Sequence, residues 1–151
     1  IASENATFQQ VGPRVGSPAA GHYVAYLTLV VGAKKAKEIW MLCHRYSAQE
    51  ALHMGLVNVV VPLEKLDEEV DKWCQELMAK SPSCLKILKA SFRALYEPLQ
   101  AVSRREWAAD FAPDFFRSGE ADEGKNAFAE RREPDFSKYP RTAGVYFSRE
   151  G

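Results

Sequence analysis

The sequence is poor in cysteine and has no excess of charge of either sign. Three of its 151 residues are cysteines, Cys43, Cys74 and Cys84, and no two of them form a C-x-x-C pair. Their odd number and wide spacing argue against a disulfide framework or a zinc site and favour a reducing, cytoplasmic compartment. Lys and Arg number 20, as do Asp and Glu, so the formal charge at pH 7 is zero. This balance argues against nucleic-acid binding and against a basic patch for membranes.

No apolar run is long and uniform enough to predict a membrane span. The nearest case, residues 15–33, holds 19 residues without a formal charge, but Pro18, His22 and several glycines interrupt it. A span needs about 20 predominantly apolar residues, so we interpret this stretch as a loop followed by a buried helix. Apolar residues make up 46% and charged residues 26%. These are globular values, and the length fits one domain or most of one.

The sequence also lacks the short motifs that mark common catalytic sites. It has no G-x-S-x-G nucleophile elbow, no phosphate-binding G-K-[ST] loop and no G-x-G-x-x-G dinucleotide fingerprint. Its histidines contain no i, i+4 pair, so we predict no metal site of that type. Three glycines, Gly12, Gly16 and Gly21, share one loop. They indicate either a tight turn or a backbone that closely approaches a ligand.

A short extended opening precedes a mainly helical pattern. Residues 1–3 have the character of the end of a strand, and residues 8–11 of a second extended piece. A chain that opens in mid-strand is expected to be the C-terminal part of something longer. Apolar residues at helical spacing predict a helix over 33–44 with one buried face. Ser47 and Glu50 form a capping box for a short helix ending at Gly55, and residues 56–61 predict a strand.

The second half of the chain predicts amphipathic helices. Residues 63–77 carry apolar residues at steps of three and four. Ser81 and Pro82 begin another helix, whose apolar stripe from Leu85 to Leu95 should be buried. We expect Pro98 to break it and a further helix to cover about 99–111. A last helix over 120–132 opens with acidic residues, which suit the positive end of the helix dipole. The basic residues near Phe128 form either a solvated face or a site for phosphates and a flat base.

Several segments together resemble the crotonase (enoyl-CoA hydratase/isomerase) superfamily. They are residues 6–17, 31–40, 46–58, 81–82, 126–128 and 132–138, and the resemblance covers about residues 1–141. The segments Gly12–Ser17 and Pro134–Lys138 are narrower in distribution. They resemble the 1,4-dihydroxy-2-naphthoyl-CoA synthase group of menaquinone biosynthesis and the ring-opening ketocyclohexanecarboxyl-CoA hydrolases.

The resemblance implies an α/β fold. Residues 1–62 would form the last turns of a spiral of β-β-α units, residues 63–141 a helical region for trimer formation and CoA contact, and residues 142–151 a tail. Such chains assemble as homotrimers or hexamers. The family's oxyanion hole, two backbone N–H groups that hold a thioester enolate, comes from a part of the fold N-terminal to these segments. A hole of this kind contributes about 3–4 kcal/mol per donor.

The resemblance also implies the site. Gly12 stands where hydratases carry a catalytic Glu, and in one class of naphthoyl-CoA synthases this glycine leaves room for a bicarbonate ion that serves as the base. Gln10 and Trp40 match the ion's other contacts, whereas Val11 replaces the family threonine and is closer to the ring-opening branch. Ser17 matches the active-site serine. No tightly bound cofactor is expected.

Two family groups are missing. The family's Asp aligns with Ala19 and its C-terminal Tyr with Phe116, so His22 or Tyr23 is either a replacement proton donor or, more simply, a packing residue. Phe128, Arg131 and Lys125 are expected to contact the adenine and phosphates of CoA.

The sequence therefore predicts an acyl-CoA lyase or hydrolase that acts through a thioester enolate. Ring closure as in the naphthoyl-CoA synthases is favoured. Hydrolytic ring opening, generic hydration or isomerisation, and an inactive assembly protein remain as alternatives.

Overall fold

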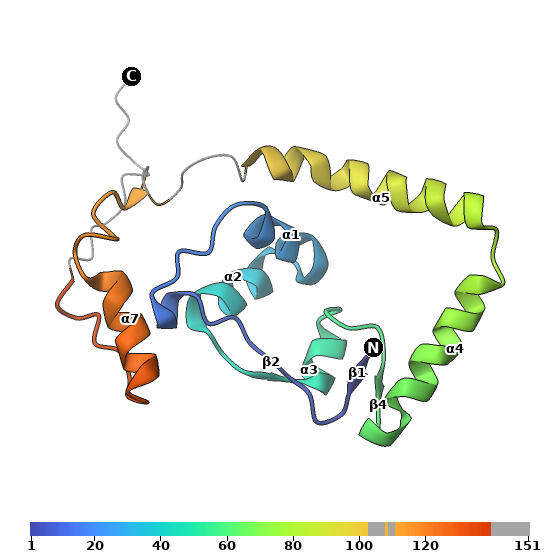
Figure 1. Cartoon of the computed structure of the whole chain (residues 1–151), viewed down its shortest axis with the longest axis horizontal. Coiled ribbons are helices and arrows are strands. Elements are labelled where there is room, and N and C mark those ends of the chain that lie inside the picture. Colours follow the sequence, from blue (N-terminus) through green and yellow to red (C-terminus); the bar gives the residue numbers. More distant parts are fainter. Residues whose placement is uncertain (103–107, 109–110, 140–151) are drawn as a thin grey trace.

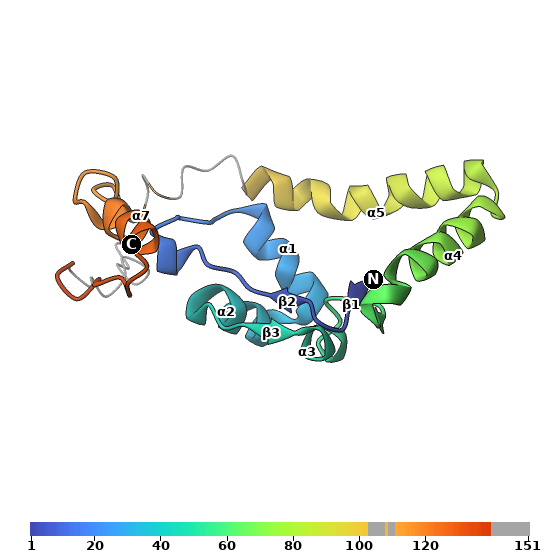
Figure 2. The same ribbon diagram turned by 60° about the horizontal axis from the view of Figure 1, so that its bottom comes forward.

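The structure, a computed structural model, describes residues 1–102, 108 and 111–139. Three short helices and two pairs of short strands form a cluster at the N-terminal end (Figure 1). From this cluster α4 and α5 extend as an arm, and α7 returns to the opposite side (Figures 1 and 2). The predicted tail, residues 142–151, lies outside the described residues.

The opening residues are extended and pair with later strands. Strand β1 (Ala2–Ser3) runs parallel to β4 (Val60–Val61), and β2 (Thr7–Phe8) runs antiparallel to β3 (Tyr46–Ser47). The strand predicted over 56–61 is real but shorter. Strand β1 contributes only two residues to the ladder, so β4 is limited to Val60–Val61. Two further backbone bonds join these segments: the Ala2 N–H donates to the Val59 carbonyl (3.0 Å) and the Glu4 N–H to the Val61 carbonyl (2.8 Å).

The best-buried apolar residues lie among these strands and the helices α2 (Ala33–Leu42) and α3 (Ala48–His53). They include Ala36 and Ile39, as the helical spacing predicted. The capping box of α3 is confirmed: Ser47 Oγ accepts from the Glu50 N–H (3.3 Å) and Glu50 Oε2 accepts from the Ser47 N–H (2.8 Å). Gly55 ends this segment with a left-handed φ of 76°, also as predicted.

Helix α1 (His22–Val31) follows the predicted loop, but the expectation that it is buried is wrong for this chain. Tyr23, Tyr26 and Leu29 are exposed. The helix packs on α2 and on part of α5, which leaves its remaining surface uncovered. None of the described helices is long and apolar enough to cross a membrane.

The arm consists of α4 (Leu66–Met78), which follows a 3-10 turn at Leu63–Lys65, and α5 (Pro82–Val102). The prediction of a buried stripe is wrong: Leu88, Phe92 and Leu95 are 54%, 63% and 60% exposed. Amphipathic spacing identifies a face suited to burial, and nothing in the described part of the chain covers this one.

Pro98 does not break α5, in contrast to our expectation. Proline removes one hydrogen bond from a helix and strains it, but tertiary contacts can hold the helix through that point. Here Tyr96 packs edge-on against Tyr26 of α1, with 4.8 Å between ring centroids. Of the further helix expected over 99–111, Leu99 belongs to α5, and residues 103–107 lie outside the described residues.

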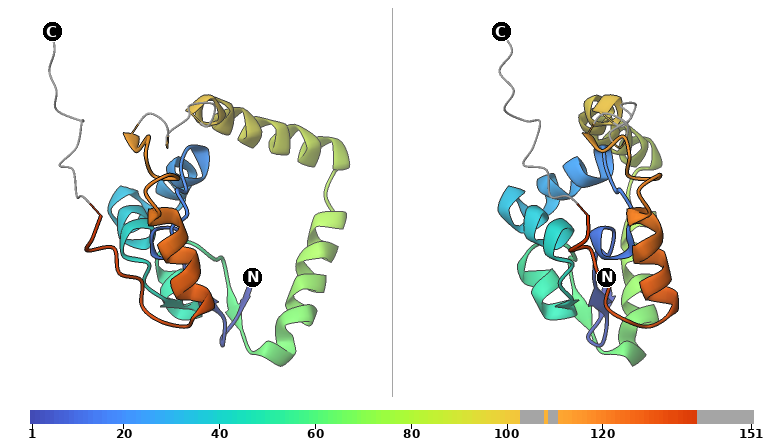
Figure 3. Two further views of the ribbon diagram at one scale, coloured as in Figure 1. Left: turned by 60° about the vertical axis from the view of Figure 1, so that its left-hand side comes forward. Right: turned by 90° about the vertical axis from the view of Figure 1, so that its left-hand side faces the viewer.

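Helix α7 (Glu120–Ala129) is confirmed, acidic first turn included, and it packs against the 3-10 turn η1 (Pro13–Val15) (Figures 2 and 3). The contact depends on two glycines. A Cβ at Gly16, whose φ is 64°, would come 2.7 Å from the Ala121 carbonyl oxygen. A Cβ at Gly124 would overlap the backbone of Val15 and Gly16. The two backbones therefore approach as closely as only glycine allows.

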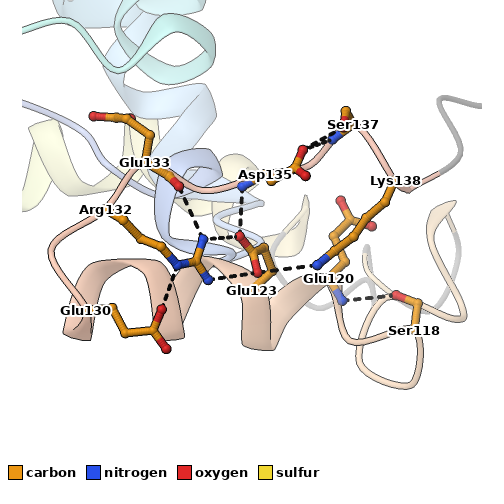
Figure 4. Close-up of polar contacts among 9 residues, drawn as sticks. All are labelled: Ser118, Glu120, Glu123, Glu130, Arg132, Glu133, Asp135, Ser137 and Lys138. Carbon is orange, nitrogen blue, oxygen red and sulfur yellow. Dashed lines mark hydrogen bonds and ion pairs between the residues drawn. The ribbon is translucent and has the colours of Figure 1, made fainter.

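A buried carboxylate ties the chain after α7 back to the helix (Figure 4). The Glu123 side chain is 8% exposed and accepts bonds from Arg132 Nη1 (2.6 Å), Arg132 Nη2 (3.1 Å) and the Asp135 N–H (2.7 Å). Lys138 Nζ lies 3.5 Å away. These partners, with Arg132 the largest contributor, lower the pKa of Glu123 to about 2. The network fixes the path of residues 130–138 along α7.

Replacing Gly124 with Ala should destabilise the protein by roughly 1–3 kcal/mol, because the added methyl group meets backbone atoms that cannot rotate away. Helix propensity alone would make the alanine variant more stable than the parent. A loss of stability would therefore result from the contact with the η1 backbone. Urea denaturation measures the change in unfolding free energy. The control is Asn126→Ala on an exposed position of the same helix, expected within about 0.5 kcal/mol of the parent. A G124A variant as stable as the parent would contradict the packing.

The Glu123 network should make stability fall in acid. A carboxylate with a lowered pKa in the folded state stabilises the protein above its unfolded pKa, and this contribution is lost as the pH falls from about 4.5 toward 2. Thermal unfolding of Glu123→Gln should show a lower Tm at pH 7 and a difference from the parent that shrinks toward pH 2. Asp122→Asn, which alters an exposed carboxylate, is the control. A difference independent of pH would argue against the network.

Candidate functional site

The bend after η1 and the first turn of α7 enclose a cavity of about 480 Å³, the Ser17 cavity. Its walls are mainly apolar, and the side chains with polar atoms that reach it come from Ser17, Trp40, Glu120 and Tyr139. The apolar lining is Pro13, Pro18, Ala19, Val24, Met41, Phe115 and Phe136. A mostly apolar cavity with a few converging polar groups is typical of a ligand site.

Ser17 is held at the cavity by the turn that precedes it. Gly16 takes a left-handed conformation, and the Ser17 N–H donates to the Gly12 carbonyl (2.9 Å). The Ser17 side chain is exposed, and its hydroxyl has no hydrogen-bond partner among the described residues. The hydroxyl is therefore available to a ligand.

Trp40 reaches the cavity from α2. Its indole Nε1 is buried and lacks a hydrogen-bond partner in the described part of the chain. Buried donors are nearly always paired, so an orphaned one indicates a group that a ligand or water satisfies.

Gly12, Gln10 and His22 do not line the Ser17 cavity. Gly12 is buried, and a Cβ there would come 3.1 Å from the Ser17 carbonyl oxygen and 3.4 Å from the Ala19 Cβ. Gln10 is half-buried. His22 is the first residue of α1, and its side chain lies outside what the structure describes.

The structure does not favour a bicarbonate ion beside Gly12, because Gly12 does not line the Ser17 cavity and a Cβ there would already lie in close contact with Ser17 and Ala19. The cavity next to it carries the Glu120 carboxylate, which would repel an anion. The unpaired Trp40 N–H is the one feature that suits the ion.

A second cavity, of about 390 Å³, is rich in arginine, and we call it the arginine cavity. Arg14 pairs with Glu133 at 2.6 Å, and Arg132 pairs with Glu123. Arg45 and Arg131 have no ion-pair partner within residues 1–102, 108 and 111–139. Gln9, Val11, Val15, Gly124, Ala127, Phe128 and Pro134 complete the lining.

Arg131 has an unusual backbone. Its φ is 55°, just after α7 ends at Ala129. Glycine or asparagine usually occupies such a left-handed position at a helix end, and other residues there are strained. A strained arginine whose side chain lines a cavity is a candidate for function.

A third hollow, of about 570 Å³, adjoins both cavities. It shares Gly16, Ser17 and Pro18 with the Ser17 cavity, and Val11, Val15 and Phe128 with the arginine cavity. Lys125 and Phe116 also line it. The structure thus brings Ser17, Phe128, Lys125 and Arg131, all expected site residues, to one connected surface around η1.

A further hollow lies around α2 and α3, and its groups Lys35, Glu38 and Tyr46 engage one another. Lys35 Nζ lies 2.8 Å from Glu38 Oε1, to which the Tyr46 hydroxyl also donates (2.9 Å). The bond from Lys35, followed by that from Tyr46, lowers the pKa of Glu38, while burial and then the bond to Glu38 raise the pKa of Tyr46 to about 12. No three His, Cys, Asp or Glu side chains gather as metal ligands in the described part of the chain.

Sequence reasoning missed two groups of the Ser17 cavity. Glu120 was interpreted only as a complement to the helix dipole, and Tyr139 only as part of the broad region 63–141, without a role at the site. Neither residue has a local signal, since each reaches the cavity only because α7 and the chain after it fold back onto η1.

Comparison with known proteins agrees with this architecture. A model of the enoyl-CoA hydratase/isomerase family matches residues 1–139. An enoyl-CoA hydratase from Mycobacterium avium subsp. paratuberculosis K-10 is 30% identical with a TM-score of 0.78, covering 89% of this chain and 54% of its own. An enoyl-CoA hydratase/isomerase from Pseudoalteromonas atlantica T6c is 29% identical with a TM-score of 0.77, covering 89% and 54%.

A methylmalonyl-CoA decarboxylase in complex with 2-nitronate-propionyl-CoA is 26% identical with a TM-score of 0.74, covering 89% of this chain and 52% of its own. The chain therefore spans about half the length of these structures. Its mixed strands, short helices and helical C-terminal region are those of the crotonase fold that the sequence segments predicted. The chain belongs to the enoyl-CoA hydratase/isomerase family, within the crotonase superfamily.

Proposed function

We propose that this chain binds an acyl-CoA and contributes to an enzyme reaction that passes through a thioester enolate. The observation that carries the proposal is the connected surface around η1, with uncommitted arginines at one end and a mostly apolar cavity with a free hydroxyl at the other. Coenzyme A thioesters have this polarity, since phosphates lie at one end and the acyl group at the other.

The arginine cavity suits the phosphate end. Guanidinium groups bind phosphate oxygens through paired charge-assisted hydrogen bonds. Arg45 and Arg131 have no competing carboxylate in the described part of the chain. Phe128, 75% exposed at the junction with the third hollow, offers a ring on which an adenine can stack.

The Ser17 cavity suits the acyl end. Apolar walls lower the local polarity and so strengthen the interaction of the Ser17 hydroxyl with a developing negative charge once a ligand displaces water. Two of the similar structures are named as enoyl-CoA hydratase family enzymes, and a third is named as a decarboxylase with a propionyl-CoA derivative bound. These names support a CoA thioester as the substrate class.

Among specific reactions we favour ring closure on an acyl-CoA, as in the naphthoyl-CoA synthases of menaquinone biosynthesis. The narrow resemblance of Gly12–Ser17 and Pro134–Lys138 supports it. Ring-opening hydrolysis is supported by Val11, and generic hydration or isomerisation by the names of the similar enzymes. The replacements at Ala19 and Phe116 support an inactive assembly protein. The enzyme would accordingly be a lyase or a hydrolase.

We also propose a homotrimer or hexamer, with 1–62 as part of the spiral core and 63–141 as the assembly and CoA-contact region. The exposed apolar residues along α5 support this division, because a contiguous apolar face on a helix is usually covered by a partner.

Replacing Arg131 with Ala should weaken CoA binding by the full-length protein roughly tenfold to a hundredfold, the value of one charge-assisted hydrogen bond. Arg131→Gly should weaken it equally without lowering stability, because glycine tolerates the left-handed backbone there. Isothermal calorimetry with CoA gives the Kd, and Arg117→Ala, outside these cavities, is the control. Unchanged affinity in both Arg131 variants would count against the proposal.

The hydratase alternative predicts turnover of crotonyl-CoA. We expect little hydration, because position 12 offers no carboxylate and each acid–base group contributes roughly 10²–10⁴-fold. Loss of the enoyl absorbance of crotonyl-CoA measures the rate. Hydration at about 1–10³ per second, the ordinary enzyme range, would favour the hydratase alternative over ring chemistry.

A further inference from the structure

We propose that Glu120 is the acid–base carboxylate of the Ser17 cavity, the group that positions 12 and 19 do not provide. The inference rests on the proposed function and adds a catalytic residue to it. Glu120 is half-buried and lines the cavity together with Ser17 and Trp40. Among the cavity-lining residues in the described part of the chain, it carries the single carboxylate.

The other acids in the first turn of α7 are committed elsewhere. Asp122 is solvent-exposed and lies 3.7 Å from Lys125, and Glu123 is bound by Arg132 and the Asp135 N–H. The Glu120 carboxylate has neither an ion-pair nor a hydrogen-bond partner among the described residues. Figure 4 shows its side chain extending toward the 135–138 segment without joining the Glu123 network. It is therefore the carboxylate of this turn that remains available for a proton.

Two other groups that line the cavity suit the rest of the reaction. The Ser17 hydroxyl and the Trp40 N–H are donors without partners in the described part of the chain. They can satisfy oxygen atoms of a bound acyl group, whereas Glu120 can accept a proton from carbon. Tyr139, from the chain after α7, also lines the cavity.

The proposed step is a reversible proton transfer. A carboxylate oxygen of Glu120 removes a proton from the carbon next to the thioester carbonyl, and the electrons of that C–H bond form the enolate. Glu120 is then a neutral carboxylic acid. It returns a proton to the same carbon, or to another atom of the rearranged substrate, and becomes a carboxylate again. No oxidant or further reactant is needed.

The test is exchange of the α-protons of butyryl-CoA in deuterium oxide by the full-length protein, followed by mass spectrometry. Glu120→Gln keeps the shape and removes the base, so exchange should fall roughly 10²–10⁴-fold while the Kd for CoA stays unchanged. Asp122→Asn is the matched control. It removes one negative charge from the same helix turn, but outside the cavity, and should exchange at the parent rate.

The outcomes separate the two proposals. Exchange by Glu120→Gln at the parent rate overturns the role of Glu120, as does exchange that requires added bicarbonate and ignores the substitution. A parent protein that binds CoA but exchanges no proton also overturns it, while leaving acyl-CoA binding intact. A parent protein that neither binds CoA nor exchanges defeats the proposed function itself. If Glu120→Gln does not fold, Glu120→Asp, which keeps the charge on a shorter side chain, should show a partial loss of exchange.

Discussion

The close approach of two backbones, at Gly16 in the loop and Gly124 in α7, is the constraint on which the site depends. Ser17 directly follows Gly16, and Glu120 directly precedes Ala121, whose carbonyl oxygen faces Gly16. The two walls of the Ser17 cavity are therefore set by one contact. No side chain separates the two backbones at this contact. The cavity beside it is lined by segments that lie more than a hundred residues apart in the sequence. Packing of this kind is specific, because even one added methylene group in a densely packed interface changes stability.

The Glu123 network stabilises the segment that follows α7 and so supports this contact. Burying a carboxylate is unfavourable unless charged and backbone donors surround it. Glu123 has both, from Arg132 and from the Asp135 N–H. The same network holds the following chain, whose Phe136 and Tyr139 line the Ser17 cavity. It also engages Arg132, whereas Arg131 at the end of α7 has no ion-pair partner among the described residues. A chain with zero net charge thus has a local cluster of cationic groups.

Local signals in the sequence predicted local structure well. The capping box at Ser47, the turn at Gly55 and the acidic start of α7 were confirmed because short-range hydrogen bonds and backbone geometry decide them. Predictions that depend on contacts with distant parts of the chain were wrong. Pro98 sits inside a helix that α1 supports nearby, and the stripe through Phe92 is exposed because the described chain brings nothing over it. Ser17 and Trp40 were each predicted as site residues from the family resemblance, whereas Glu120 lines the same cavity through tertiary packing alone.

The absence of a side chain at position 12 and the carboxylate at position 120 are linked by the same turn. The Ser17 N–H donates to the Gly12 carbonyl, and the Ser17 carbonyl oxygen would lie 3.1 Å from a Cβ at position 12. A side chain at position 12 would therefore require the turn to adjust, whereas glycine fits it without a shift. The closed turn, in contrast, presents Gly16 to α7 and so brings Glu120 to the cavity. In this chain the carboxylate next to the turn therefore comes from α7 and not from position 12.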